Sequence, residues 1–114
     1  MFEQVEQKDI VLIPIPFTNL ASYKRRPVIV ISNNAYNKAT GDMVVIAMTS
    51  NPVLTTYSFV ITSIDLKNGS LKRPSVVRVD KIYTLSQKLI VQKFGQINIS
   101  VLNKIYKVFS ELIN

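Results

Sequence analysis

The chain of 114 residues is 47% hydrophobic and only 18% charged, and it contains no cysteine and no histidine. Its length predicts a single domain over residues 1–114 with a substantial core, and the two missing residue types exclude disulfides, thiolate chemistry and the usual zinc ligands. Fourteen Lys and Arg against seven Asp and Glu give a net charge of +7, which favours an anionic partner such as nucleic acid or an acidic protein segment.

The composition and the apolar runs predict how the chain assembles and where it is located. With so few charges, some apolar surface is expected to stay outside the core, which predicts a homo-oligomer, most simply a symmetric dimer. The acidic start of the chain, Met1–Glu6, carries no targeting signal, and the longest apolar run, Met43–Met48, is too short to span a bilayer. These features predict a cytoplasmic protein with no membrane partner.

Short apolar runs separated by turn residues predict a β-rich chain. The expected strands cover residues 10–17, 28–31, 42–48, 57–61, 75–80 and part of 89–97. Residues 35–41 are expected to form a loop or one helical turn, and turns are predicted at Asn68-Gly69 and at residues 84–86. Because Pro14 and Pro16 cannot donate to a ladder, the end of the first strand is expected at a sheet edge or a bulge.

A basic triplet, Lys24-Arg25-Arg26, lies between a predicted loop over residues 18–23 and Pro27. Pro27 fixes its own φ and forces Arg26 into an extended conformation, so the arginine is expected at the entrance of the following strand. A rigid strand that brings guanidinium groups to one rim suggests a phosphate or carboxylate site. The alternative is a solubilising charge cluster before a strand.

The C-terminus is predicted to be an amphipathic helix. Its apolar residues recur at helical spacing and form one stripe, consisting of Val101, Leu102, Ile105, Val108, Phe109, Leu112 and Ile113. Ser100 is the expected N-cap, and Gly95 marks a bulge in the last strand. Short strands followed by one terminal helix predict a mainly β fold, a small barrel rather than a parallel α/β sheet.

Half of the cations lie in two short windows that adjoin core strands. The windows contain Lys24, Arg25 and Arg26, and then Lys72, Arg73, Arg78 and Lys81. Tyr23, Tyr57 and Tyr83 are interleaved with them, which favours single-stranded nucleic acid because tyrosine stacks on unpaired bases. The alternative is a solvated basic rim with tyrosines that only cover the core.

Two pairs of polar side chains are candidates for chemistry. Thr49 and Ser50 stand where an apolar strand stops, so they either satisfy the strand-end backbone or bind a phosphate oxygen. A period of two places Arg78 and Asp80 on one strand face, where they form a surface ion pair or supply a base and a charge stabiliser. The scattered acidic residues lack the spacing of a metal cage, so no metal site and no cofactor are expected.

Five short motifs in order resemble the MazF/PemK (Kid) toxins of type II toxin–antitoxin systems. The motifs are Asp9–Leu12, Phe17-Thr18, Lys24–Val30, Met48–Ser50 and Pro74–Asp80. The resemblance implies a small SH3-like β-barrel of the MazF/Kid/CcdB type that forms a homodimer. It also implies metal-independent, sequence-specific cleavage of single-stranded RNA, mainly mRNA, with a 2′,3′-cyclic phosphate and a 5′-hydroxyl as products. The cognate antitoxin would cover the same basic groove with an acidic, flexible tail.

By this resemblance the family's catalytic positions fall on Arg26, Thr49, Arg78 and Asp80. Arg26 would contact the scissile phosphate, where charge builds up, and Thr49 would hold the same phosphate through its hydroxyl. Asp80 would take the 2′-hydroxyl proton, with Arg26 as the alternative base, and Arg78 would stabilise charge. A histidine that some members use near the first loop is missing here. The residues expected to bind RNA are Tyr23, Lys24, Arg25, Ser50, Lys72, Arg73 and Lys81.

Two rival functions fit the same fold class. One is a toxin that poisons DNA gyrase through its terminal helix, although the end of this chain, Glu111–Asn114, has no tryptophan and little resembles that branch. The other is a catalytically inert barrel that binds RNA or protein. Such a barrel would bind RNA with strong salt dependence and release no fragments.

Overall fold

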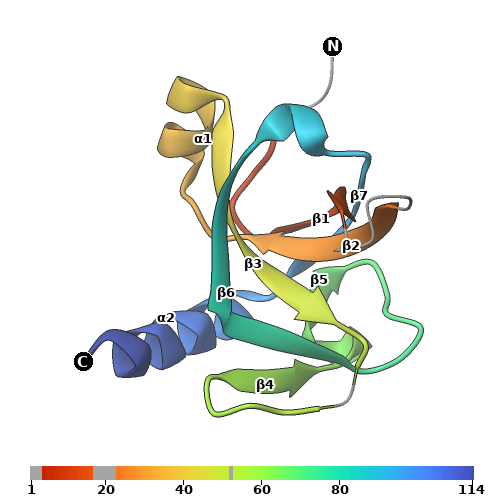
Figure 1. Ribbon diagram of the computed structural model, residues 1–114, viewed down its shortest axis with the longest axis vertical. Helices are drawn as coiled ribbons and strands as arrows, with labels where there is room; N and C mark the ends of the chain where they lie inside the picture. Colours follow the sequence, from red (N-terminus) through yellow and green to blue (C-terminus); the bar gives the residue numbers. More distant parts are fainter. Residues whose placement is uncertain (1–3, 17–22, 52) are drawn as a thin grey trace.

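The computed structural model describes residues 4–16, 23–51 and 53–114, which form a curled antiparallel sheet with two α-helices (Figure 1). The strands are β1 (Asp9–Pro16), β2 (Tyr23–Val30), β3 (Asp42–Thr49), β4 (Ser58–Ile61), β5 (Leu66–Asn68), β6 (Ser75–Ser86) and β7 (Gln92–Ile97). The helices are α1 (Asn34–Thr40) and α2 (Ile99–Ile113), with short 3-10 turns at Ser63–Asp65 and Gln87–Leu89. The predicted mainly β fold with a C-terminal amphipathic helix is confirmed.

The strands follow the order β4-β6-β3-β2-β1-β7-β5 in one sheet. β1 pairs with β2 as far as Pro16, whereas its pairing with β7 stops at Leu12. Pro14 and Pro16 therefore lie beyond the β7 ladder, where the missing N–H groups cost no hydrogen bond to that strand. The expectation of a sheet edge at the end of the first strand is confirmed.

Apolar side chains fill two clusters, one on each face of the curled sheet. Residues along β2 alternate between them: Ile29 belongs to the larger cluster, whereas Val28 and Val30 belong to the smaller one. The larger cluster also takes in Ile46 of β3 and Ile105 of α2. Alternation of this kind is what a strand with both faces covered requires.

Helix α2 begins two residues earlier than predicted, at Ile99, and is only partly covered by the sheet. Asn98, not Ser100, is the N-cap residue, with an extended backbone at φ −70° and ψ 157°. Ile105 is buried, but Phe109 and Ile113 are 37% and 66% exposed. Figure 1 shows why, since the C-terminal half of α2 extends past the edge of the sheet. None of the helices in the described ranges is long and apolar enough to cross a membrane.

Strand β6 is longer than predicted and contains a bulge. The turn expected at residues 84–86 is wrong, because these residues pair with Asp42–Val44 of β3 and continue the ladder. The register then shifts: Ile46 of β3 pairs with Ile82, but the next residue, Ala47, pairs with Arg78. Residues 79–81 are thus looped out of the β3 ladder, which bends the strand.

Two further differences from the sequence-based prediction concern short elements. Residues 34–40 form a true helix, capped by the Asn33 side chain and ended by Gly41 in the left-handed region at φ +72°. β5 was not predicted; Asn68 of the predicted Asn68-Gly69 turn is its last residue, and Gly69 follows it in the left-handed region at φ +87°. The bulge predicted at Gly95 is confirmed, because Ile10 pairs with Gly95 and Val11 with Lys93, leaving Phe94 as the extra residue.

Candidate functional site

The basic triplet lies inside β2, not in front of it as predicted. Arg25 pairs with Pro14 and Arg26 with Ile13, and β3 joins β2 only from Val28 onward. The strand extends further because the proline-rich end of β1 supplies a partner for the extended residues before Pro27. Arg25 is exposed and Arg26 is half-buried, whereas the side chains of Tyr23 and Lys24 fall outside the described residues.

Arg78 and Asp80 form a two-point ion pair at the bulge of β6. The Arg78 Nε donates to Oδ1 of Asp80 and Nη2 donates to Oδ2, both at 2.9 Å. Arg78 is the last residue before the bulge and pairs with Ala47 on one side and Ser58 of β4 on the other. The two side chains are 25% and 31% exposed, so the pair is open to solvent on one side. The predicted placement of both groups on one strand face is confirmed.

This contact sets the charge state of both groups. Hydrogen bonds from Arg78 hold the pKa of the Asp80 carboxyl below its ordinary value, and the neighbouring Lys81 acts in the same direction. The same hydrogen bonds raise the pKa of Arg78. At neutral pH Asp80 is a carboxylate able to accept a proton, whereas Arg78 cannot give one up. Two of the five guanidinium N–H groups bind Asp80, which leaves three that can donate to a phosphate.

Thr49 ends β3 next to this pair. It pairs with Val76, two positions along the ladder from the Ala47–Arg78 pair, so Thr49 and Arg78 share a face of the sheet. Its Oγ1 accepts a hydrogen bond from the Asn51 N–H at 3.1 Å. The strand-end role expected as one alternative is therefore observed, and the Thr49 hydroxyl proton can still be donated to a phosphate oxygen.

Arg26 belongs to the same face by register. Val28 pairs with Ala47, which pairs in turn with Arg78, and Arg26 is two residues from Val28 along β2. Since side chains two residues apart in a strand point to the same side, Arg26, Thr49 and Arg78 line one face near the ends of β2 and β3. We call this surface, with Asp80, the candidate catalytic face. Lys81 is exposed beside Asp80 in the bulge.

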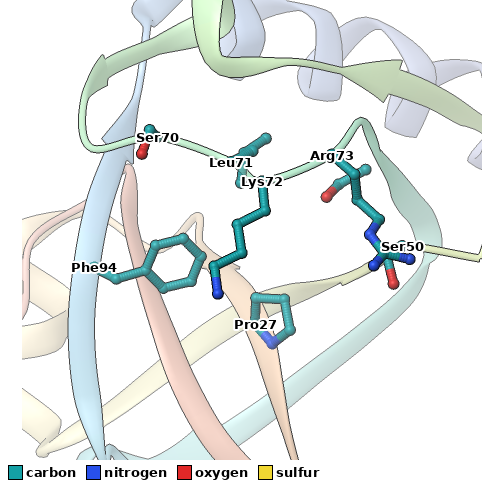
Figure 2. A pocket seen from close by; sticks show the side chains of 8 residues that line it. Pro27, Ser50, Ser70, Leu71, Lys72, Arg73 and Phe94 are labelled. Atoms are coloured by element: carbon teal, nitrogen blue, oxygen red, sulfur yellow. The ribbon is translucent and has the colours of Figure 1, made fainter.

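The other predicted RNA-binding residues line a separate pocket of about 450 Å³ (Figure 2). The pocket is lined by Pro27, Ser50, Ser70, Leu71, Lys72, Arg73, Ser75 and Phe94. In Figure 2 the Lys72 side chain reaches from its loop toward Pro27, beside the ring of Phe94. Of the predicted RNA-binding residues, Ser50, Lys72 and Arg73 thus line this pocket and lie outside the candidate catalytic face.

Phe94, Ser70 and Ser75 were missed as site residues. Phe94 comes from β7, and the two serines come from the β5–β6 loop and the start of β6; all three are far from Pro27 in the chain, and the fold brings them beside it. The single local signal was the bulge at Gly95, since a bulge re-aims the neighbouring side chain. In the part of the chain that the structure describes, no three acidic side chains are grouped so that they could hold a metal ion.

Comparisons with known proteins agree with this architecture. The family model of PemK-like, MazF-like toxins of type II toxin–antitoxin systems matches residues 6–113. No curated protein matches the chain.

Several solved structures share the fold. MazE–MazF (Form-II) from Deinococcus radiodurans superposes with a TM-score of 0.78 at 19% identity, covering 98% of this chain and 97% of that chain. An endoribonuclease in complex with its cognate antitoxin from a Mycobacterial species gives 0.72 at 19%, covering 96% and 94%. The endoribonuclease from a Mycobacterial species gives 0.73 at 19%, covering 99% and 94%. At these identities the similarity establishes the fold.

Proposed function

The chain belongs to the PemK-like, MazF-like toxins of type II toxin–antitoxin systems, and we propose that it is a metal-independent endoribonuclease that cleaves single-stranded RNA, mainly mRNA, in the cytoplasm. The observation that carries this proposal is the Arg78–Asp80 pair, held open to solvent on the same face as Thr49 and Arg26. The net charge of +7 supports an anionic substrate.

In the proposed reaction Asp80 takes the proton of the ribose 2′-hydroxyl as the 2′-oxygen attacks the adjacent phosphorus. The bond from phosphorus to the 5′-oxygen breaks, that oxygen takes a proton from water, and the products are a 2′,3′-cyclic phosphate and a 5′-hydroxyl. When the Arg78 guanidinium donates hydrogen bonds to the phosphate, its interaction with Asp80 weakens. The pKa of Asp80 then rises, and the carboxylate becomes a stronger base. Substrate binding itself would then activate the carboxylate.

Arg26 and Thr49 act on the phosphate in this scheme. The charge on the phosphate oxygens grows in the transition state, and a fixed guanidinium near those oxygens stabilises it more than it stabilises the ground state. Arg26 is held in place because it is extended between Pro27 and the paired β1. Thr49 contributes a hydroxyl that is oriented by its bond from the Asn51 N–H.

Two partners complete the proposal. An antitoxin with an acidic, flexible tail would cover the basic surface, and two structurally similar toxins are described together with an antitoxin, which supports a partner of that kind. The second partner is another copy of the chain. Tyr106, Phe109 and Ile113 leave an apolar face on α2 that is 50%, 37% and 66% exposed, which supports a homodimer.

Primer extension on a long single-stranded RNA, with and without excess chelator, tests the activity and locates the cuts. Arg26→Ala is expected to abolish cutting with the fold intact. Lys38→Ala on α1 is the control, because it removes one positive charge from a residue outside the predicted RNA-binding set. Normal cutting by Arg26→Ala would make the basic triplet a scaffold only.

The same preparation separates the rival functions. An inert binding barrel would retain RNA on a filter in a salt-dependent manner and yield no fragments. A gyrase poison would block DNA supercoiling without cutting RNA. The family match favours neither rival.

A further inference from the structure

We propose that the pocket defined by Pro27, Ser50, Lys72, Arg73 and Phe94 holds the base of a nucleotide next to the cleaved bond and thereby sets part of the cleavage sequence. This inference rests on the proposed function and extends it, since it assigns a substrate subsite to residues outside the candidate catalytic face.

The lining of the pocket has the composition of a nucleotide site. Phe94, Leu71 and Pro27 give it an apolar floor, and both Phe94 and Leu71 pack against the larger core cluster, which keeps them in place. An aromatic ring held in this way can stack on an unpaired base. A volume of about 450 Å³ lies within the range of about 300–1,000 Å³ that is typical of small-ligand sites.

The polar groups around that floor match the rest of a nucleotide. Lys72 and Arg73 stand exposed on the loop between β5 and β6, where their charges can meet the phosphates on either side of the base. Ser50 and Ser70 add exposed hydroxyls that can donate to or accept from a base edge. Lys72 has a long, flexible stem, so its ammonium group can follow the ligand.

The position of the pocket ties it to the cleaved bond. Pro27 follows Arg26 directly in β2, and Ser50 follows Thr49 directly at the end of β3. Neighbouring residues in a strand point to opposite faces, so Pro27 and the pocket that it lines lie on the opposite side of β2 from Arg26. The ends of β2 and β3 form the rim between the pocket and the candidate catalytic face. An RNA strand whose phosphate contacts Arg26 and Thr49 can therefore cross the rim and place an adjacent base in the pocket.

Two substitutions of Phe94 isolate the stacking contribution. Phe94→Leu keeps an apolar side chain against the core and removes the ring, whereas Phe94→Tyr keeps the ring. Mapping of 5′ ends over a long RNA is expected to show unchanged sites for Phe94→Tyr. For Phe94→Leu we expect the preference at one position beside the cut to be lost, and the rate at the native sequence to fall roughly tenfold or more. Equal thermal unfolding of the two variants excludes a folding defect.

A binding measurement locates the base directly. Short RNAs with the mapped cleavage sequence carry the fluorescent base 2-aminopurine at one position at a time. They are bound to Asp80→Asn protein, which is expected to cut them at least about 100-fold more slowly than the native protein. One position is expected to be quenched on binding, and Phe94→Leu in the Asp80→Asn background should abolish that quenching while Phe94→Tyr keeps it.

The charge on the rim has its own control. Lys72→Ala is expected to weaken RNA binding and to reduce its salt dependence. Lys38→Ala removes an equal charge from α1, outside the pocket, and should leave both the affinity and its salt dependence unchanged. If the native protein cuts RNA and Phe94→Leu retains both its sites and its rate, the base pocket is refuted while the ribonuclease stands. If the native protein cuts no RNA, the proposed function itself fails.

Discussion

The exchange Asp80→Asn separates a catalytic role of the Arg78–Asp80 pair from a structural one. Asn has nearly the same size and keeps one carbonyl oxygen, so it retains one of the two contacts that Arg78 makes at 2.9 Å. It loses the negative charge and the ability to take a proton. The change therefore removes the chemistry proposed for Asp80 and leaves most of the packing.

The expected losses of stability and of rate differ widely in size. The paired side chains are 25% and 31% exposed, so water screens them and the pair contributes at most about 1 kcal/mol to folding. A general base contributes roughly 10²–10⁴ in rate, which corresponds to about 3–5 kcal/mol in the activation free energy. A loss of folding stability of at most about 1 kcal/mol does not by itself slow cleavage about 100-fold, because the protein remains folded.

Single-turnover cleavage of a labelled RNA and urea unfolding measure the two quantities on the same protein. We expect Asp80→Asn to cut at least about 100-fold more slowly while its unfolding free energy falls by less than about 1 kcal/mol. Asp42→Asn, at the opposite end of β3 from Thr49, removes the same charge and should cut normally. A native rate for Asp80→Asn would refute the assignment and make Arg26 the candidate base.

The pH dependence gives a second reading of the same group. Because hydrogen bonds from Arg78 lower the pKa of Asp80 and the chain has no histidine, the base stays ionised as the pH falls from about 7 to about 5. We expect no acid limb in kcat/KM within this window, and one near pH 6 would contradict the assignment. Because the pKa of Asp80 is lower in the folded protein, the ionised carboxylate stabilises the fold at pH values above its unfolded pKa of about 4. This stabilisation is lost as the pH falls through the pKa of the folded state.

Three further outcomes are expected. Cleavage should persist in excess chelator, and its loss on chelation, restored by a divalent metal, would contradict the metal-free reaction. Gly95→Ala should lower the unfolding free energy by about 1–3 kcal/mol in a urea titration, because a Cβ there would lie 2.7 Å from the Asn68 carbonyl oxygen. Gly41→Ala meets no atom within 4 Å and should cost only about 1 kcal/mol, from the left-handed backbone at φ +72°. Ile113→Glu on the exposed face of α2 should convert a dimer to a monomer in light scattering, and an unchanged mass would place the dimer contact elsewhere.

The sequence predicted those parts of the fold that depend on local pattern. The continuous apolar run 42–48 and the alternation at 57–61 correspond to β3 and β4, and helical spacing identified α2. It failed at residues 84–86, where turn-forming Thr84 and Ser86 sit in a strand because β3 offers them a partner. Strand propensity is weak enough for such pairing to override it.

For the candidate site, too, the sequence predicted what depends on local pattern and missed what depends on strand pairing. A period of two was sufficient to place Arg78 and Asp80 on one face, because that rule needs no partner strand. Ser50 and Lys72 could not be separated from Arg26 in the same way, since which side of the rim they occupy depends on how β2, β3 and β6 are paired. Long-range register has no local signature, and a shift of one residue exchanges the two faces.

The bulge in β6 shows how that register creates the site. In an uninterrupted ladder Asp80 would have a β3 residue directly beside it, and its side chain would compete with that neighbour for space. With residues 79–81 looped out of the β3 ladder, Val79 instead donates its N–H to the Tyr57 carbonyl at 3.0 Å. The backbone thus keeps a hydrogen bond while the strand bends, and Asp80 can turn toward Arg78 with one side open to water. The exposed ion pair that the proposed chemistry needs is a consequence of this irregularity in the sheet.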